Sequence, residues 1–299
     1  MVDISKITTE RRNDRTKNID LVSTCEILRM INEEDKKVPL AVEAAIDQIA
    51  WVVDVVTQAF REGGRLFYIG AGTSGRLGVL DASEVPPTFG VDDSMVIGII
   101  AGGDNALRHA VEGAEDSYSE AKESLKAYNL NERDVVIGIA ASGRTPYVVG
   151  GLEYANKVKA KSCCITTSKN SKIANIAKYP IEAITGAEPL TGSTRMKSGT
   201  AQKLILNMIT TASMVKLGKV YENLMIDVQM SNNKLISRAK TIVMEVTGVD
   251  LEIAEVYLEK YNSVKLAIFA ILSKIEDKKV LQDILNNYNG NIRESLKNI

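Results

Sequence analysis

The residues from 70 to 84 combine side chains that can bind a phosphate with a carboxylate that can transfer a proton. Three glycines in the segment 70–75 surround Thr73 and Ser74, and Glu84 follows a few helical turns later. Glycine lets the backbone turn tightly and approach a ligand. The start of a helix offers unpaired N–H groups and a positive dipole end to an anion. We therefore expect a phosphate-binding turn at the start of a helix here.

The same six residues also match the G-x-G-x-x-G fingerprint of dinucleotide-binding proteins. That alternative requires an acidic residue at the end of the second strand, where it would hold a ribose hydroxyl. The apolar run ending at Ala101 continues instead into Gly102 and Gly103, and Asp104 comes only afterwards. Nucleotide binding is therefore the weaker alternative.

Two further turns rich in hydroxyls and glycine favour a compact phosphate. One, at 141–145, follows the apolar run 134–141, and the other, at 191–197, opens a long helical pattern. Ligands of open parallel sheets gather at the carboxyl ends of the strands. Any one of these hydroxyls could serve only to cap its own helix, but two turns with Ser, Gly and Arg at one sheet edge favour a phosphosugar site.

Proton transfer would fall to carboxylates, Lys or Tyr, because the chain has a single histidine, His109. A Ser-His-Asp triad would have to use this residue, which lies far from any nucleophile turn. No Cys-x-x-Cys or His-Glu-x-x-His spacing predicts a zinc site. Glu84 and Glu115 could act as general acid and base if burial separated their pKa values. Spacing alone does not distinguish them from the other acidic residues, most of which are expected to be solvated.

The turns must be positioned by a parallel sheet, because strand and helix signals alternate along the middle of the chain. Continuous apolar runs suggest strands that are buried on both faces. Strands are predicted at Arg65–Ala71, Met95–Ala101, Asp134–Ala141, Lys161–Thr167 and Ile181–Thr185. Helices are predicted between them at Gly75–Glu84, Asn105–Tyr128, Pro146–Lys159 and Ser171–Ala177.

The flanking segments are predicted to be helical and without strands. Residues 1–20 suggest an extended or partly ordered arm, and strand signals stop after residue 185. The predicted domains are an N-terminal arm with helices at 1–64, an α/β domain at 65–230 and a helical subdomain at 248–299. A wider core of the α/β domain, over 45–247, is the alternative. Further helices are predicted at 23–32, 38–60, 194–216 and 231–247, with three short ones after residue 250.

Composition limits the classes of partner. The chain of 299 residues has 45% hydrophobic residues, a net charge of −1 and no basic block, so nothing electrostatic argues for binding to nucleic acid or to an anionic membrane. No apolar run approaches the length of a membrane helix, and the N-terminus lacks a signal-peptide core. Three cysteines, of which Cys163 and Cys164 are expected to be buried thiols, give no disulfide framework. We expect a cytoplasmic protein.

Longer stretches of the sequence resemble the N-acetylmuramic acid 6-phosphate etherase family. The resemblance runs from about Thr9 to the C-terminus and is strongest over 65–230. The motifs that carry it are Tyr68-x-Gly-Ala-Gly-Thr-Ser-Gly-Arg-Leu-Gly, Leu80-Asp-Ala-Ser-Glu84, Pro86-Pro-Thr, His109-Ala-Val-Glu-Gly-Ala-Glu-Asp116, Gly138-Ile-Ala-Ala-Ser-Gly-Arg-Thr-Pro-Tyr147, Gly192-Ser-x-Arg-Met-Lys-x-Gly-Thr-Ala-Gln-Lys203 and Asn223-Leu-Met-x-Asp-Val228.

This resemblance implies a fold and a reaction. The fold would be a sugar isomerase (SIS) type three-layer α/β sandwich, with a parallel sheet of about five strands flanked by helices and a small C-terminal helical subdomain. The reaction would cleave the D-lactyl ether of N-acetylmuramate 6-phosphate with water, giving N-acetylglucosamine 6-phosphate and D-lactate. A cytoplasmic homodimer, no metal and no cofactor are also implied.

The resemblance also assigns roles to residues. Glu115 would abstract the C2 proton of the open-chain sugar, and Glu84 would protonate the departing lactyl oxygen and then activate water. Arg76 and Arg144 could pair with the phosphate or with the lactyl carboxylate, or could form ordinary surface ion pairs. An aldose–ketose isomerase and a non-catalytic phosphosugar sensor remain as alternatives. The implied phosphate-binding residues are Gly72, Thr73, Ser74, Ser142, Gly143, Thr145, Ser193, Thr194 and Lys197.

Overall fold

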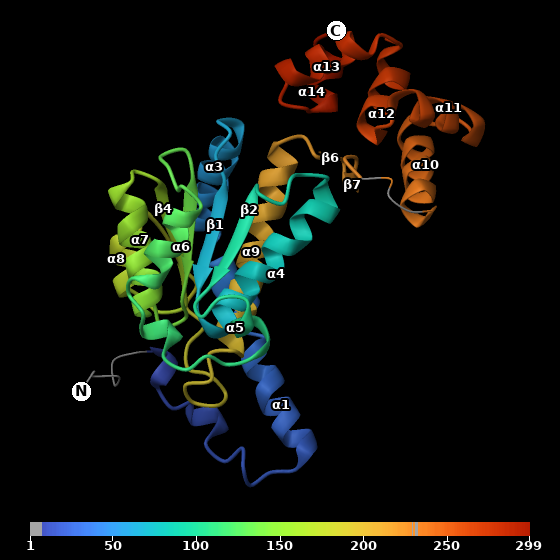
Figure 1. Ribbon diagram of the computed structural model, residues 1–299. Helices are drawn as coiled ribbons and strands as arrows, with labels where there is room; N and C mark the ends of the chain where they lie inside the picture. The colour runs from blue at the N-terminus through green and yellow to red at the C-terminus, as the bar shows by residue number, and fades with distance from the viewer. Residues whose placement is uncertain (1–7, 229, 231–232) are drawn as a thin grey trace. The chain divides into compact units, whose positions relative to one another are not determined.

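The computed structural model describes residues 8–228, 230 and 233–299, which form two compact units (Figure 1). The first unit comprises Met1–Ser83 and Ser94–Thr210, and the second comprises Glu84–Asp93 and Thr211–Ile299. The domain boundaries predicted after residues 64 and 230 were drawn from sequence patterns. The division into these two units does not test them, and they stay predictions.

The first unit is built on a five-stranded parallel sheet with the order β2-β1-β3-β4-β5, which confirms the predicted fold class. Each predicted strand is present, although the last begins at Tyr179 rather than at Ile181. Pro180 is tolerated there because β5 lies at the edge of the sheet. The strands are β1 (Leu66–Gly70), β2 (Val96–Ile100), β3 (Val135–Ile139), β4 (Lys161–Thr166) and β5 (Tyr179–Glu182).

Helices cover both faces of this sheet, so the unit has three layers (Figure 1). On one face, Phe67 and Ile69 of β1 pack with Leu125 of α6 (Glu120–Ala127) and Leu152 of α7 (Pro146–Lys157). The short α8 (Lys172–Ile176) joins this layer. On the other face lie α3 (Ile46–Arg61) and the parts of α4 (Gly72–Phe89) and α9 (Lys197–Lys216) that belong to the unit.

A buried hydrogen-bonded group fastens that second layer to the sheet. Tyr68 of β1 donates to Asp81 of α4 at 3.0 Å, and Thr210 of α9 donates to the same carboxylate at 3.2 Å. Burial raises the pKa of Asp81, while the two hydroxyl donors oppose that shift. One side chain thus joins a strand and two helices, which fixes the helix that carries the first phosphate turn.

Two of the predicted helices are broken. The pattern at 38–60 forms α2 (Val38–Glu43) and α3. The pattern at 105–128 forms α5 (Asn105–Arg108), a 3-10 turn η3 (Ala114–Asp116) and α6. His109 is extended and Gly113 adopts φ 74°, a left-handed conformation that ends helical structure. Glu115 therefore lies on a short turn instead of inside a long helix.

The N-terminal part of the first unit is more helical than the predicted arm. It forms η1 (Thr8–Glu10), η2 (Asp14–Thr16) and α1 (Thr24–Asp35), while residues 1–7 of the predicted arm lie outside the described residues. Ser23 and Glu26 close a capping box at the start of α1. The helix extends away from the sheet, and Leu28 on it is 62% exposed (Figure 1).

The second unit contains a helical subdomain, as predicted, and a small antiparallel hairpin that was not predicted. The hairpin joins β6 (Val220–Tyr221) to β7 (Leu224–Met225), and its turn uses Glu222 at φ 52°. Ile242, Leu258 and Phe269 contribute to a separate apolar core. Four short helices follow residue 250 instead of three. The helices that lie wholly within this unit are α10 (Asn233–Thr247), α11 (Leu251–Tyr261), α12 (Val264–Ser273), α13 (Lys278–Asn287) and α14 (Ile292–Lys297).

Within the described part of the chain, no helix is long and apolar enough to cross a membrane. Cys163 and Cys164 are buried free thiols in β4, as expected, and burial raises the pKa of each.

Candidate active site

The first two hydroxyl-rich turns follow β1 and β3, which are neighbours at the centre of the sheet. The strand order reverses between these two strands, and ligands of open α/β sheets bind at such a switch point. Gly72 adopts φ 54° where the chain leaves β1, and Gly143 adopts φ 66° after β3. The topology thus places the turns at 72–75 and 142–145 at the same edge of the sheet.

The start of α9 lies against the first turn. Ser74 Oγ donates to Gln202 Oε1 at 2.9 Å. A Cβ placed on Gly199 would lie 3.4 Å from Thr73 Cγ2, so the two helices approach closely at that glycine. Because Ser193 and Thr194 lie just before α9, this packing brings the third predicted turn to the first.

A buried chain of hydroxyls connects the second turn to α9. The carbonyl of Ala141 accepts the backbone N–H of Thr167, just after β4, at 3.1 Å. The hydroxyl of Thr167 donates to Ser198 Oγ at 3.0 Å, and Ser198 donates to Glu188 at 2.7 Å. All three side chains are buried. The positions of the second and third turns are therefore coupled by hydrogen bonds that exclude water.

Glu188 accepts the last hydrogen bond of this chain of hydroxyls. No role was predicted for it from the sequence. Its carboxylate is fully buried and accepts the backbone N–H groups of Lys197 and Ser198 at 2.8 and 2.9 Å. A carboxylate there satisfies unpaired N–H groups at the start of α9 and complements the helix dipole. No short motif marks this role, since Glu188 lies in a loop and caps the helix from a distance in sequence.

Lys197, predicted to bind phosphate, is not placed with the half-buried hydroxyls. Its ammonium is 1% exposed and donates to Glu34 Oε2 and to the Thr185 carbonyl, each at 2.9 Å. Burial disfavours ionised Glu34, but hydrogen bonds from Lys37 and Lys197 outweigh it and lower the pKa of Glu34 to about 2. Lys197 thereby ties α1 to α9, and we leave it out of the proposed phosphate site.

The remaining predicted phosphate ligands present hydroxyls that are only half-buried. Ser142, Ser193 and Thr194 belong to this group. Thr145 is the N-cap of α7, but its side chain makes no capping hydrogen bond, so the hydroxyl is not used for the helix start. This excludes the alternative that the Thr145 hydroxyl serves only to cap its own helix.

A pocket of about 280 Å³ adjoins the first turn and contains Glu115. Gly72 and Arg76 line it from α4, and Glu115 lines it from η3. The broken helix at 105–119 is what brings this carboxylate to the carboxyl ends of β1 and β2. Glu84 is exposed on α4, about three turns after Gly72, and it belongs to the second unit.

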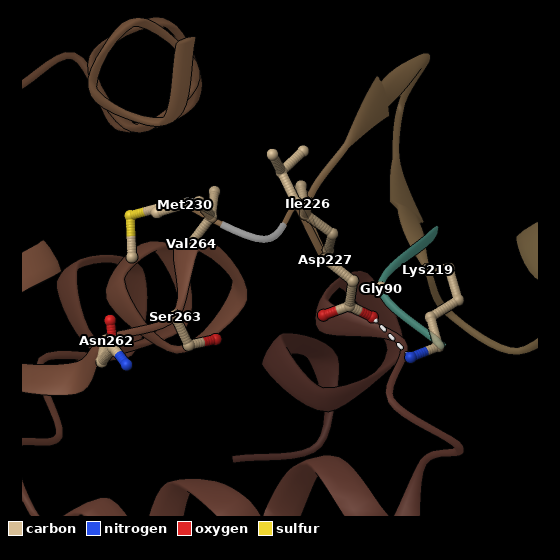
Figure 2. Close-up of a pocket in the computed structure, with 9 residues that line it drawn as sticks. Gly90, Lys219, Ile226, Asp227, Met230, Asn262, Ser263 and Val264 are labelled. Carbon is tan, nitrogen blue, oxygen red and sulfur yellow. Dashed lines mark ion pairs between the residues drawn. The ribbon is translucent and has the colours of Figure 1, made fainter. Parts of the chain in front are cut away.

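A larger pocket of about 400 Å³ lies entirely within the second unit (Figure 2). Its charged groups are used within the protein: Asp227 pairs with Lys219 at 3.1 Å and with Lys265 at 2.8 Å. A Cβ on Gly90 would lie 2.2 Å from the Asp227 carbonyl, which explains the glycine at that point of the wall. Because the two charged side chains that line this pocket, Lys219 and Asp227, already pair with each other, the smaller pocket beside the phosphate turns is the better candidate for catalysis.

Comparison with known proteins identifies the family. Residues 117–212 match a model described as SIS domain, and residues 48–156 match the glucokinase regulatory protein N-terminal SIS domain. N-acetylmuramic acid 6-phosphate etherase of Actinobacillus pleuropneumoniae serotype 7 is 56% identical over 296 residues, which cover 99% of this chain and 97% of the relative. The chain belongs to the N-acetylmuramic acid 6-phosphate etherase family.

Other comparisons agree with this etherase assignment. The protein of the same name from Clostridium botulinum is 56% identical over 297 residues, covering 99% of this chain and 98% of the relative. A phosphoheptose isomerase structure from Francisella tularensis matches 65% of this chain and 100% of its own with a TM-score of 0.50. At 16% identity, that structural likeness supports the SIS fold alone. The etherase family resemblance inferred from the motifs is thus confirmed.

Proposed function

We propose that this protein cleaves the D-lactyl ether of N-acetylmuramic acid 6-phosphate with water, releasing N-acetylglucosamine 6-phosphate and D-lactate. The observation that carries this proposal is the 56% identity to etherases over 99% of the chain. The hydroxyl turns beside a carboxylate-bearing pocket support it, because the substrate needs an anion site for the phosphate on C6 and a separate proton-transfer group at C2 and C3.

Elimination followed by hydration is the proposed mechanism. In the open-chain aldehyde, the C2 proton is acidic because it lies next to the carbonyl. Glu115 takes this proton, the C3–O bond breaks and lactate departs, and water then adds to C3 of the unsaturated aldehyde. Each positioned proton transfer contributes about 10²–10⁴-fold to the rate. The place of Glu115 in the pocket with Gly72 supports its role as the base.

The phosphate is proposed to lie among the half-buried hydroxyls of the three turns. Thr73, Ser74, Ser142 and Thr145 are the main candidates, and Ser193 and Thr194 supplement them. Neutral donors and backbone N–H groups suit a phosphate monoester at a helix start. The glycines at 72 and 143 allow the backbone to approach it.

Glu84 is proposed as the general acid that protonates the departing lactyl oxygen. The protein is also proposed to be a cytoplasmic homodimer. Exposed apolar side chains on three neighbouring helical segments, Leu28, Leu40 and Trp51, support association because each is more than 60% exposed. Sedimentation equilibrium should find a dimer in solution, and a monomer would contradict this association.

The decisive assay incubates the protein with N-acetylmuramic acid 6-phosphate and measures D-lactate. Lactate release with equal formation of N-acetylglucosamine 6-phosphate is expected. A ketose phosphate without lactate would instead identify an isomerase. Binding without any turnover would identify a sensor, and either result would overturn the etherase proposal.

A further inference from the structure

The pocket that contains Glu115 is lined by small apolar side chains and a single cation. Arg76 supplies the positive charge, while Glu112 and Glu115 supply two negative charges. A ligand carboxylate would be repelled by these two glutamates unless it paired with the guanidinium. The apolar lining, which accommodates a group of methyl size, consists of Ala71, Ala101, Ala106, Ala110, Val111 and Ala114.

A backbone carbonyl fixes the orientation of Arg76. Its Nε donates to the carbonyl of Leu107 at 3.0 Å, and the side chain is half-buried. Among the residues that the structure describes, no carboxylate forms an ion pair with it, whereas Arg65 pairs with Asp134 at 2.8 Å. Partial burial of an unpaired charge is unfavourable. A guanidinium held in a pocket in this way is suited to a planar anion that arrives with the ligand.

The two sides of the first turn of α4 face different parts of the protein. Thr73 and Ser74 face α9, where Gly199 and Gln202 contact them. Arg76 faces the segment after β2 through its bond to Leu107. The hydroxyls and the guanidinium therefore point to different neighbours, which separates a phosphate on the α9 side from a second anion in the pocket.

We propose that Arg76 binds the lactyl carboxylate of the substrate, and that the alanine-lined wall holds the lactyl methyl group. This assignment rests on the proposed etherase function, since N-acetylmuramic acid 6-phosphate carries a carboxylate that N-acetylglucosamine 6-phosphate lacks. It makes Arg76 the residue that distinguishes substrate from product. Glu115 lies in the same pocket. This agrees with the substrate, in which the lactyl group on C3 is next to the C2 carbon that loses its proton.

The test compares Arg76→Gln with a matched control, Arg108→Gln, which changes an exposed arginine at the end of α5. Each variant is assayed with N-acetylmuramic acid 6-phosphate and with its lactyl amide, in which the carboxylate is neutral. For Arg76→Gln, KM for the acid should rise about 10–100-fold, as expected for loss of a charged hydrogen bond. Its KM for the amide should change little, and Arg108→Gln should behave as wild type with both.

Direct binding of inorganic phosphate and of N-acetylglucosamine 6-phosphate provides the second measurement. Both should bind Arg76→Gln as tightly as wild type. Equal weakening of acid, amide and phosphate would assign Arg76 to the phosphate instead, and unchanged kinetics with the acid would remove it from recognition. Both outcomes overturn the assignment while lactate release by wild type upholds the etherase function. Absence of lactate release by wild type would overturn the two together.

Discussion

The α9 side and the pocket side of the first turn of α4 are built in opposite ways. On the α9 side, Glu188, Lys197 and Ser198 are at most 1% exposed, and their polar atoms are hydrogen-bonded within the protein. On the pocket side, Glu112 and Glu115 are exposed and lie on a segment of short turns. The first side holds the hydroxyl turns in place, and the second presents charges to a ligand.

This difference separates stability from activity. Removal of a buried polar partner leaves the other group unsatisfied, which lowers the free energy of unfolding. Replacement of an exposed carboxylate leaves nothing unsatisfied, so its effect should appear in catalysis alone. Variants on the two sides should therefore fall into two distinct classes.

The largest effect is expected on the pocket side. Glu115→Gln should lower kcat for D-lactate release by about 10²–10⁴-fold, because it removes the proposed base. Its thermal unfolding should match that of wild type. The matched control is Glu112→Gln, which changes an exposed carboxylate of the same pocket. Equal loss of activity in both variants would indicate a general charge effect and would contradict the assignment of Glu115.

On the α9 side, Glu34→Gln should lower the free energy of unfolding by about 3–5 kcal/mol, because the buried ammonium of Lys197 loses its counter-ion. Denaturant unfolding measures this loss. The double variant with Lys197→Met should recover much of the stability, since no buried charge then remains unpaired. If the double variant instead loses as much unfolding free energy as the two single variants together, the pair is not coupled.

The same carboxylate predicts a pH dependence of stability. The folded-state pKa of Glu34 is lowered to about 2 from its ordinary value of 4.5. The stabilisation is therefore complete above about pH 4.5 and is lost as the pH falls towards 2. The shift corresponds to about 3 kcal/mol. The difference in unfolding free energy between wild type and Glu34→Gln should shrink across this range, and a constant difference would refute the ion pair as its cause.

A smaller effect is expected from the glycine of the second turn. Gly143→Ala places a Cβ 2.3 Å from Ser171 Cβ, whereas Gly103→Ala meets nothing within 4 Å. Both glycines have a left-handed φ, so the backbone strain is common to the two variants. We expect Gly143→Ala to be about 1–3 kcal/mol less stable than Gly103→Ala, because overpacking distinguishes them. Equal stabilities would mean that the second turn adapts freely.

The sequence was sufficient for the sheet and its turns because these depend on local patterns. Continuous apolar runs indicate buried strands, and glycine next to hydroxyls marks the turn that follows. A parallel sheet, expected from the alternation of strands and helices, predicts that the turns at 72–75 and 142–145 lie at one edge, and the observed strand order agrees.

The remaining features depend on contacts between distant residues. Glu188 caps a helix from a loop, Gln202 binds Ser74, and Lys197 binds Glu34, which is far away in sequence. The helical pattern at 105–128 was misleading because apolar spacing continues through the left-handed Gly113. Both sides therefore have features that local patterns could not predict, and the role of Glu115 came from family resemblance.

The smallest effect on stability should separate two hydroxyls that both begin helices. Ser171 accepts the N–H of Ala174 at 3.3 Å, while Thr145 makes no capping bond. Ser171→Ala should lower the free energy of unfolding by about 1 kcal/mol. Thr145→Val should change it by less than about 0.5 kcal/mol, yet raise KM for the phosphosugar about tenfold or more if its hydroxyl binds the phosphate. An unchanged KM would remove Thr145 from the phosphate site, and a loss of stability equal to that of Ser171→Ala would show that its hydroxyl serves the helix after all.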